Sequence, residues 1–429
     1  MVIGPYETKP DETVTRSAAA RLSEINGLAE AIDLDIISSS VMPLKAIRPA
    51  TYLGKGRIED LAVMVAAEDA ELIVIDAILS PTQQRNLERE LKAKVLDRTA
   101  LILEIFGARA QTKEGSLQVE HAHLTYQKSR LVRSWTHLER QRGGFGFLGG
   151  PGETQIEADR RQIQERLNRI ARDLETVRRT RGLHRHQRKR RNTPVGVLVG
   201  YTNAGKSTLF NQISGAGVLS QDLLFATLDP TSRQINLGDS REFILSDTVG
   251  FVSSLPTSLI AAFRATLEEV VEADIIIHVQ DVSAPDHEAQ HGDVLSVLGE
   301  LGVEIDENPK IINVLNKIDR LPDDKRSILV NQTARARGSL KPVLCSSMTG
   351  EGIDELLATI RERLSDHAVE ECVFELQPQD GAAMNWLYEV GKVLKRETSD
   401  DGVTHMRVIL SKDRADAFQS RFSGVQRSL

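Results

Sequence analysis

Residues 200–207 constrain the chain most, because they fit the pattern G-x-x-x-x-G-K-[ST] of a phosphate-binding loop. An apolar run at 195–199 is typical of a buried strand, and residues 207–213 are typical of the start of a helix. Strand, glycine-rich turn and helix form the arrangement in which backbone N–H groups and a helix N-terminus surround phosphate oxygens. We therefore predict a nucleotide site formed by Gly200, Tyr201, Thr202, Asn203, Ala204, Gly205, Lys206 and Ser207. Lys206 is expected to reach the outer phosphates, and the Ser207 hydroxyl to hold Mg²⁺.

A second motif, Asn316-Lys317-Ile318-Asp319, indicates that the base is guanine. It follows the apolar run 311–315, at the carboxyl end of a predicted strand, where ligands of open α/β sheets bind. An aspartate there accepts two hydrogen bonds from the N1–H and exocyclic amine of guanine, and adenine offers neither in that geometry. We predict that Asp319 selects guanine, that Asn316 ties its loop to the phosphate loop, and that the stem of Lys317 covers the base.

A third motif, Asp247-Thr248-Val249-Gly250, follows the predicted strand 243–245. This position lies at the same edge of a parallel sheet as the phosphate loop. Asp247 is therefore expected to reach Mg²⁺ through water, and the Gly250 N–H to meet the γ-phosphate.

Two further loops complete the predicted site. The first contains Phe225, Ala226, Thr227, Leu228 and Asp229, followed by Pro230 and Thr231. We expect Thr227 to give Mg²⁺ a second hydroxyl once the γ-phosphate is present, with Thr231 as the alternative. The second loop contains Cys345, Ser346 and Ser347, whose backbone N–H groups are expected to support the guanine O6.

The expected catalytic groups are Lys206, Thr227 and Gly250, because phosphoryl transfer depends on positioning and charge stabilisation. The expected metal ligands are Ser207 and Thr227. What the pattern lacks is a side chain that orients water. Phe251 follows Gly250 where many GTPases carry glutamine, and phenylalanine cannot align a water molecule. We therefore expect slow hydrolysis by the chain alone and acceleration by a partner.

Charge is distributed unevenly along the chain. The formal net charge is −7, but residues 117–192 hold 18 Lys and Arg against 8 Asp and Glu, so this segment is strongly basic. Within it, residues 178–191 contain eight basic side chains. This run suits contact with the phosphate backbone of RNA, with contact to an acidic face of the chain's own nucleotide domain as the rival interpretation.

The order of predicted elements indicates a multidomain α/β protein. We expect a small N-terminal α/β domain (1–115), a helical hairpin with a glycine-rich loop and a basic end (116–192), a doubly wound GTPase domain (193–366) and a small C-terminal α/β domain (367–429). Residues 1–30 are largely polar and predict no element.

Local signals within these domains are of unequal strength. Strands are expected at 34–37 and 72–75, and Ser80-Pro81 is expected to open a helix. Residues 51–57 predict either a plain turn or a second anion-binding loop. In the last domain we expect strand, helix, strand and helix at 372–376, 382–395, 403–410 and 414–421.

The hairpin is predicted from two helices, 117–142 and 153–178. The second carries a heptad-like seam of Ile156, Ile163, Leu167, Ile170, Leu174 and Val177, which suits antiparallel pairing with the first. Between them, residues 143–152 hold six glycines together with Phe145, Phe147 and Leu148. This segment is either a flexible linker or a loop whose aromatic side chains contact a partner.

The cysteine content favours a cytoplasmic protein, and we expect it to be monomeric. No stretch of about 18 apolar residues is present that could cross a bilayer, so we expect no transmembrane segment. The two cysteines, Cys345 and Cys372, give neither a disulfide framework nor a zinc set. The first 16 residues lack the basic and then apolar order of a secretion signal.

The whole chain resembles the HflX family of ribosome-associated GTPases. The resemblance is carried by residues 200–208, 225–231, 247–251 and 316–319, and most specifically by residues 143–161 (GGFGFLGGPGETQIEADRR). It implies binding of GTP or GDP with Mg²⁺, and docking of the N-terminal domain and hairpin on the large ribosomal subunit and its RNA, without DNA specificity. It also implies that the GTP-bound protein splits stalled or idle ribosomes, particularly under stress.

Two points stay open beside the resemblance. Ser347 stands where many GTPases carry alanine, which is harmless if only the backbone is used there. The alternative function is an RNA-binding factor in ribosome assembly whose release is timed by GTP. A kinase with the same phosphate loop is disfavoured by the guanine motif at 316–319.

Overall fold

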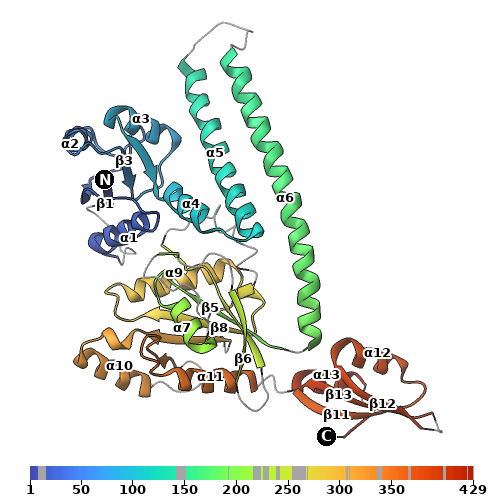
Figure 1. The fold of residues 1–429 in the computed structure, drawn as a ribbon. Coiled ribbons are helices and arrows are strands. Elements are labelled where there is room, and N and C mark those ends of the chain that lie inside the picture. Colours follow the sequence, from blue (N-terminus) through green and yellow to red (C-terminus); the bar gives the residue numbers. More distant parts are fainter. Residues whose placement is uncertain are drawn as a thin grey trace.

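The structure is a computed structural model of the chain. It describes residues 1–7, 16–141, 151–191, 193–215, 224–225, 231–237, 242–253, 267, 269–305, 308, 310–335, 341–365, 369–399, 402–422 and 424–428. Three sheets and a pair of long helices make up the architecture (Figure 1). The α/β multidomain class predicted from the sequence is confirmed, whereas the domain limits given above stay predictions.

The N-terminal unit is a parallel sheet in the order β2-β1-β3-β4. Its strands are β1 (Val2–Glu7), β2 (Ser39–Leu44), β3 (Leu72–Ile75) and β4 (Lys94–Asp97). Its helices are α1 (Ala18–Glu30), α2 (Lys55–Ala67), α3 (Pro81–Leu91) and α4 (Arg98–Arg109). As predicted, Ser80 caps α3 and Pro81 is its first residue. Residues 51–54 form a turn that leads into α2, with Gly54 as its N-terminal cap.

Two sequence-based expectations for this unit are wrong. Residues 34–37 are not a strand but the connection between α1 and β2, which begins at Ser39. Conversely, β1 lies where the sequence predicted nothing, and it pairs with both β2 and β3. Its first two residues, Val2 and Ile3, are buried. The position of β1 is set by strands far along the chain, so a local pattern does not reveal it.

The hairpin consists of α5 (Lys113–Gln141) and α6 (Pro151–Arg191), which lie side by side (Figure 1). The predicted seam faces α5: Leu167 and Ile170 are buried, and Ile163, Leu174 and Val177 are half-buried. Arg166 forms an ion pair with Glu120 across the pair. The basic run continues α6 as helix to Arg191. The glycine-rich loop with Phe145, Phe147 and Leu148 lies outside the described residues.

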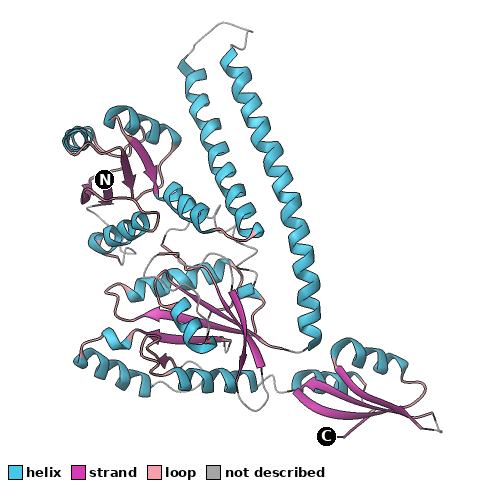
Figure 2. Ribbon diagram, viewed as in Figure 1, coloured by secondary structure: helices cyan, strands magenta, loops and turns pink. Residues whose placement is uncertain are grey.

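The central sheet has the order β10-β9-β8-β5-β7-β6, and every pair is parallel except β6–β7. Its strands are β5 (Val195–Gly200), β6 (Thr231–Asn236), β7 (Glu242–Asp247), β8 (Ile275–Asp281), β9 (Ile311–Asn316) and β10 (Val343–Leu344). Helices α7 (Lys206–Ser214), α9 (His287–Glu300), α10 (Asp323–Arg335) and α11 (Ile353–Ser365) cover its two faces (Figure 2). The carboxyl ends of β5, β7, β8 and β9 therefore meet at one edge, where open α/β sheets bind ligands.

The C-terminal unit is an antiparallel sheet in the order β12-β13-β11-β14. It contains β11 (Val369–Leu376), α12 (Gly381–Val390), β12 (Lys392–Thr398), β13 (Thr404–Ser411), α13 (Lys412–Arg421) and β14 (Gln426–Ser428). The helix expected at 382–395 ends at Val390, because the chain turns at Gly391 and enters β12. A Cβ at Gly391 would lie 2.5 Å from Val408 Cγ1, so this turn packs directly on the sheet.

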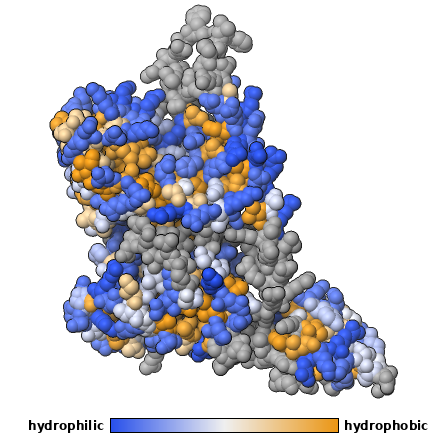
Figure 3. All heavy atoms as spheres, viewed as in Figure 1, coloured by the Kyte–Doolittle hydropathy of each residue, from blue (hydrophilic) through white to orange (hydrophobic). Residues whose placement is uncertain are grey.

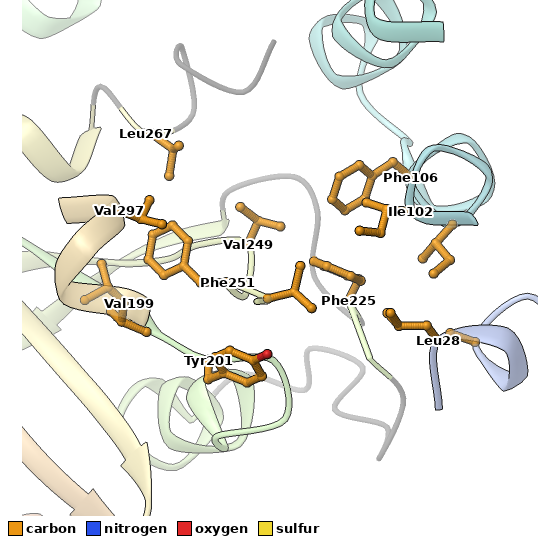
Figure 4. Close-up of a cluster of buried hydrophobic side chains, with 14 of the residues drawn as sticks. Leu28, Ile102, Phe106, Val199, Tyr201, Phe225, Val249, Phe251, Leu267 and Val297 are labelled. Atoms are coloured by element: carbon orange, nitrogen blue, oxygen red, sulfur yellow. The ribbon is translucent and has the colours of Figure 1, made fainter. Parts of the chain in front are cut away.

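The N-terminal unit and the central sheet share one apolar cluster (Figure 4). Phe225 lies between Val249 of the central unit and the side chains of Leu28, Ile102 and Phe106. The rings of Phe106 and Phe225 meet edge to face, with centroids 4.7 Å apart. The two units are therefore in direct contact at the loop that was predicted to sense the γ-phosphate.

Hydrophilic side chains dominate the face of the molecule shown in Figure 3, with apolar patches between them. Among the described residues, no helix has the length and apolar character needed to span a membrane.

Candidate functional site

The phosphate loop joins β5 to α7 and has the predicted strand–turn–helix geometry. Gly205 caps α7 with a φ of +94°, in the region that favours glycine. A Cβ at Gly205 would lie 2.3 Å from Asn316 Nδ2, so the position is restricted by space as well as by conformation. Asn203 also has a positive φ, which asparagine tolerates better than most residues. The loop is thus shaped by its own sequence and by the guanine motif that packs on it.

Lys206 lies under the loop, and its ammonium donates to the carbonyls of Gly200 (3.1 Å) and Tyr201 (2.8 Å). The side chain is buried. Burial lowers the pKa of Lys206 to about 8, an effect that nearby Asp247 opposes. A cation held in this way beside the loop amides suits an anionic ligand, because a phosphate would stabilise the charged form of the lysine.

Ser207 and Asp247 bring two oxygen groups together at the start of α7. The Ser207 hydroxyl donates to Asp247 Oδ2 over 2.7 Å, and the Asp247 carboxylate is fully buried. The neighbouring Thr248 hydroxyl donates to the Leu198 carbonyl over 2.6 Å, which fixes the motif on β5. A hydroxyl and a carboxylate are ligands that suit Mg²⁺, which retains several waters and phosphate oxygens in such sites. The residues present therefore fit the predicted ion.

Gly250 lies directly on the phosphate loop. A Cβ there would be 2.9 Å from Thr202 Cα and 3.0 Å from Lys206 Nζ, so only glycine allows this approach. The next residue holds the arrangement: the Thr202 N–H donates to the Phe251 carbonyl (2.7 Å), and the Phe251 N–H donates to the Gly200 carbonyl (3.1 Å). The expected position of Gly250 beside the outer phosphates is compatible with this geometry.

The Phe251 side chain points into the core and away from the phosphate loop. It is 1% exposed and lies beside Val199 and Val297 (Figure 4). Its ring is therefore a packing element of the central unit, in agreement with the expectation that it cannot orient water.

The guanine motif is built onto the phosphate loop through Asn316. Its Nδ2 donates to the Ala204 carbonyl (2.8 Å) and to Ser347 Oγ (3.1 Å), and its Oδ1 accepts from the Ser347 N–H (2.9 Å). The Ser347 hydroxyl thus accepts a hydrogen bond, so the side chain as well as the backbone is used at this position, where many GTPases carry alanine. Ile318 is buried, whereas Asp319 is exposed at the rim, open to a ligand.

Lys317 reaches back over the phosphate loop. Its ammonium donates to the Asn203 carbonyl (2.7 Å) and pairs with Asp281 Oδ2 (2.8 Å) at the end of β8. Asp281 was not among the predicted site residues. It follows an apolar strand, as the other motifs do, and this is the signal that could have found it.

The loop at 345–347 differs in detail from the expectation. In this structure the N–H groups of Cys345, Ser346 and Ser347 donate within the protein, to Leu315 O, Glu351 O and Asn316 Oδ1 respectively. Their predicted support of guanine O6 stays a prediction.

Of the loop at 225–231, only its ends are described. Phe225 is buried and has a φ of +57°. Thr231, the alternative metal ligand, is the first residue of β6. Ala226, Thr227, Leu228 and Asp229 lie outside the described residues, so the Mg²⁺ role of Thr227 stays a prediction.

Tyr201 has a part that the motif does not reveal. Its hydroxyl contacts Glu24 in α1 and Arg16, both of the N-terminal unit, and also Ser253. No spacing in the sequence links these residues to the phosphate loop. The one available signal is the presence of a bulky tyrosine in an otherwise small and tight loop.

Four family models match the chain in order. They are described as GTP-binding GTPase N-terminal (residues 19–107), GTP-binding GTPase Middle Region (109–188), 50S ribosome-binding GTPase (195–317) and HflX C-terminal domain (331–428). The GTPase HflX of Magnetococcus marinus is 51% identical over 349 residues, which cover 81% of this chain and 79% of that protein. The chain belongs to the HflX family of GTPases. The resemblance found in the sequence is therefore confirmed.

A second relative agrees with this assignment. The GTPase HflX of Escherichia coli K12 is 41% identical over 387 residues, covering 90% of this chain and 89% of that protein. A solved structure of a GTP-binding protein from the archaeon Sulfolobus solfataricus, in complex with GDP, is 24% identical and covers 85% of this chain and 98% of that one, with a TM-score of 0.43.

The crowding at Gly205 generates a first prediction. Gly205→Ala should destabilise the fold and weaken GDP binding, because its methyl group would overlap the Asn316 amide and separate the guanine motif from the loop. Gly215→Ala is the matched control: Gly215 also has a positive φ but faces open space, so only backbone strain of about 1–2 kcal/mol is expected. Thermal unfolding and GDP titration of both variants would check this. Equal destabilisation with unchanged GDP affinity in both would contradict it.

The depressed pKa of Lys206 generates a second prediction. Below pH 8 the lysine is charged in the free and bound protein, so affinity should not depend on its titration. Above pH 8 the free protein loses this proton and must regain it to bind phosphate, so GDP affinity should fall by up to about tenfold per pH unit. Titrations with a fluorescent GDP between about pH 7 and 9 would measure the slope. Lys206→Arg, which stays charged, should remove the slope, and a flat wild-type profile would refute the assignment.

Proposed function

We propose that this chain binds and hydrolyses GTP, slowly by itself and faster on the large ribosomal subunit, and that its GTP-bound form splits stalled or idle ribosomes into subunits. The observation that supports the nucleotide part is that the buried Asn316 amide joins the guanine motif to the phosphate loop and to the loop at 345–347, at one sheet edge. The ribosomal part is supported by membership of the HflX family and by the match over 195–317 to a model described as a 50S ribosome-binding GTPase. We further propose a cytoplasmic monomer.

The chemistry follows from the groups around the phosphate loop. Lys206 and the loop N–H groups would stabilise the charge that develops on the transferred phosphoryl group. Ser207 and Thr227, with Asp247 beside Ser207, would hold Mg²⁺, and the ion would supply positive charge to offset the negative charge of the phosphates. The Gly250 N–H would bind the γ-phosphate, and Asp319 would select guanine.

The slow intrinsic rate is proposed from Phe251. Its ring is part of the apolar core, so the chain has no side chain at this position to orient the attacking water. A partner that orders the loops or supplies a catalytic group would then accelerate hydrolysis.

The surface proposed for ribosome binding is the hairpin of α5 and α6. Its basic sequence, concentrated in residues 178–191, suits the phosphate backbone of ribosomal RNA. The same feature keeps a second candidate function open, an RNA-binding factor in ribosome assembly whose release is timed by GTP. Splitting of intact ribosomes distinguishes the two functions.

The guanine assignment is tested by Asp319→Asn. The variant should lose affinity for GTP and gain affinity for xanthosine triphosphate, because the amide donates to the xanthine carbonyl that replaces the guanine amine. Loss of a paired charge-assisted contact predicts at least about tenfold weaker GTP binding. Competition between the two nucleotides would measure the exchange, and unchanged GTP affinity would refute the role of Asp319.

The ribosomal function is tested by measuring GTP turnover with and without purified large subunits, and subunit splitting by sedimentation of intact ribosomes. We expect turnover to rise roughly 10–1,000-fold, within what a supplied catalytic group can give. Splitting should occur with GTP and with a non-hydrolysable analogue. Asp319→Asn provides the control, since xanthosine triphosphate and not GTP should support its activity. Stimulation without splitting would favour the assembly function, and fast turnover by the chain alone would contradict the proposal.

A further inference from the structure

A buried group of charged and polar side chains joins the N-terminal unit to the phosphate loop. Its members are Arg16, Glu24, Arg98, Tyr201 and Ser253, which we call the Glu24 cluster. Three of them come from the N-terminal unit. Tyr201 follows the first glycine of the phosphate loop, and Ser253 lies three residues after Gly250. The cluster therefore contacts both segments that flank the proposed γ-phosphate position.

Glu24 is the centre of the cluster. Its Oε2 accepts from the Tyr201 hydroxyl (2.5 Å) and from Arg16 (2.8 Å). Its Oε1 accepts from the Ser253 hydroxyl (3.1 Å) and from the Arg98 guanidinium. One carboxylate in the N-terminal unit thus binds the phosphate loop and the segment after Gly250 at the same time.

Ser253 is held from several sides. Its N–H donates to the Tyr201 hydroxyl (2.7 Å), and its carbonyl accepts from Arg98 Nη2 (3.1 Å). Arg98 is itself fixed by Asp76, whose Oδ1 accepts from Arg98 Nη1 over 2.6 Å. Because Ser253 is tied to Arg98 and Tyr201 together, movement of the segment after Gly250 away from the phosphate loop requires these bonds to break.

Burial makes this dependence strong. The side chains of Glu24 and Arg98 are 9% and 5% exposed, so neither charge can be taken up by solvent while the units stay together. Burial alone would raise the pKa of Glu24, but Arg98 and Arg16 hold it below its ordinary value. Removing one member of such a group leaves an uncompensated buried charge, which is far more unfavourable than loss of a surface ion pair.

A second contact between the units acts on the other phosphate-sensing loop. Phe106 of α4 packs edge to face on Phe225, two residues before Thr227. The N-terminal unit therefore contacts the phosphate loop, the segment after Gly250 and, at Phe225, the start of the loop that contains Thr227.

We propose that the Glu24 cluster couples docking of the N-terminal unit to recognition of the γ-phosphate, with Glu24 and Tyr201 as positioning residues. The docked unit holds Gly250 against Thr202 and beside Lys206, where its N–H can meet a γ-phosphate. GTP and docking then stabilise one another, and GDP, which lacks that phosphate, does not benefit from the docked position. The inference rests on the GTP binding proposed above but needs no ribosome.

Reciprocity gives this proposal a measurable form. If GTP tightens docking, then docking must raise affinity for GTP over GDP by the same factor. Glu24→Gln should therefore weaken binding of a non-hydrolysable GTP analogue by roughly fivefold or more, the lower end of typical coupling, with GDP affinity nearly unchanged. Tyr201→Phe should lower the ratio of analogue affinity to GDP affinity by a similar factor. Matched controls are Glu120→Gln, an ion-paired glutamate on the hairpin, and Tyr126→Phe, whose hydroxyl donates to buried Asp97 outside the cluster.

Docking is measured separately by pulsed EPR between spin labels at Val63→Cys and Ile328→Cys, exposed positions in α2 and α10. The native cysteines are buried. In the otherwise wild-type chain, the analogue should narrow the distance distribution relative to GDP. In Glu24→Gln and Tyr201→Phe the two nucleotides should give the same distribution, and the controls should behave as wild type.

The outcomes separate this inference from the proposed function. Two results for the Glu24 and Tyr201 variants would overturn the coupling and leave GTP binding intact. One is equal weakening of analogue and GDP binding. The other is a wild-type ratio of analogue to GDP affinity together with a wild-type change in label distance between the two nucleotides. A wild-type distance that is the same with both nucleotides would also overturn it. A wild-type chain that binds neither nucleotide would overturn the proposed function and this inference together. Thermal unfolding of Tyr201→Phe, the mildest change, shows whether the fold is retained.

Discussion

The buried amide of Asn316 is the contact on which the nucleotide site depends. It donates to the phosphate loop at Ala204 and to Ser347, and accepts from the Ser347 N–H. Only an amide of this length offers both a donor and an acceptor at these positions. A carboxylate would instead place an oxygen that can only accept a hydrogen bond against the Ala204 carbonyl oxygen, which is also an acceptor. Because the amide is fully buried, an unpaired group would be strongly unfavourable. Three loops from separate parts of the chain are thereby fixed as one surface.

The parts of this site that could be predicted are those in which chemistry is confined to consecutive residues. The motifs at 200–207, 247–250 and 316–319 each follow a strand, so their residue types and their place at the sheet edge were both visible in the sequence. The pairing of Lys317 with Asp281 and the contacts of Glu24 were not visible, because they join segments that only the packed fold brings together. For the same reason, the sequence did not predict β1, which is an inner strand of the N-terminal sheet.

Elements near chain turns were also difficult to predict. Residues 34–37 have a strand-like apolar pattern, but they form the connection between α1 and β2. In the C-terminal unit, a helix-like pattern ran past Gly391, where close packing on Val408 forces a turn. In both cases tertiary contacts override the local preference, whereas the capped start of α3 at Ser80 and Pro81 is local and was predicted correctly.

The position of Phe251 connects the chemistry of the site to the contact between the units. Its ring fills the core beside Val199 and Val297, so an amide in its place would enter an apolar environment without a partner. The central unit therefore gains packing at the position where another GTPase would gain a water-orienting group. Under the proposed function, control of hydrolysis would come through the neighbouring loops, at Phe225 and Ser253. Both are covered by the N-terminal unit, through Phe106 and Arg98, so this unit is in direct contact with both of these loops.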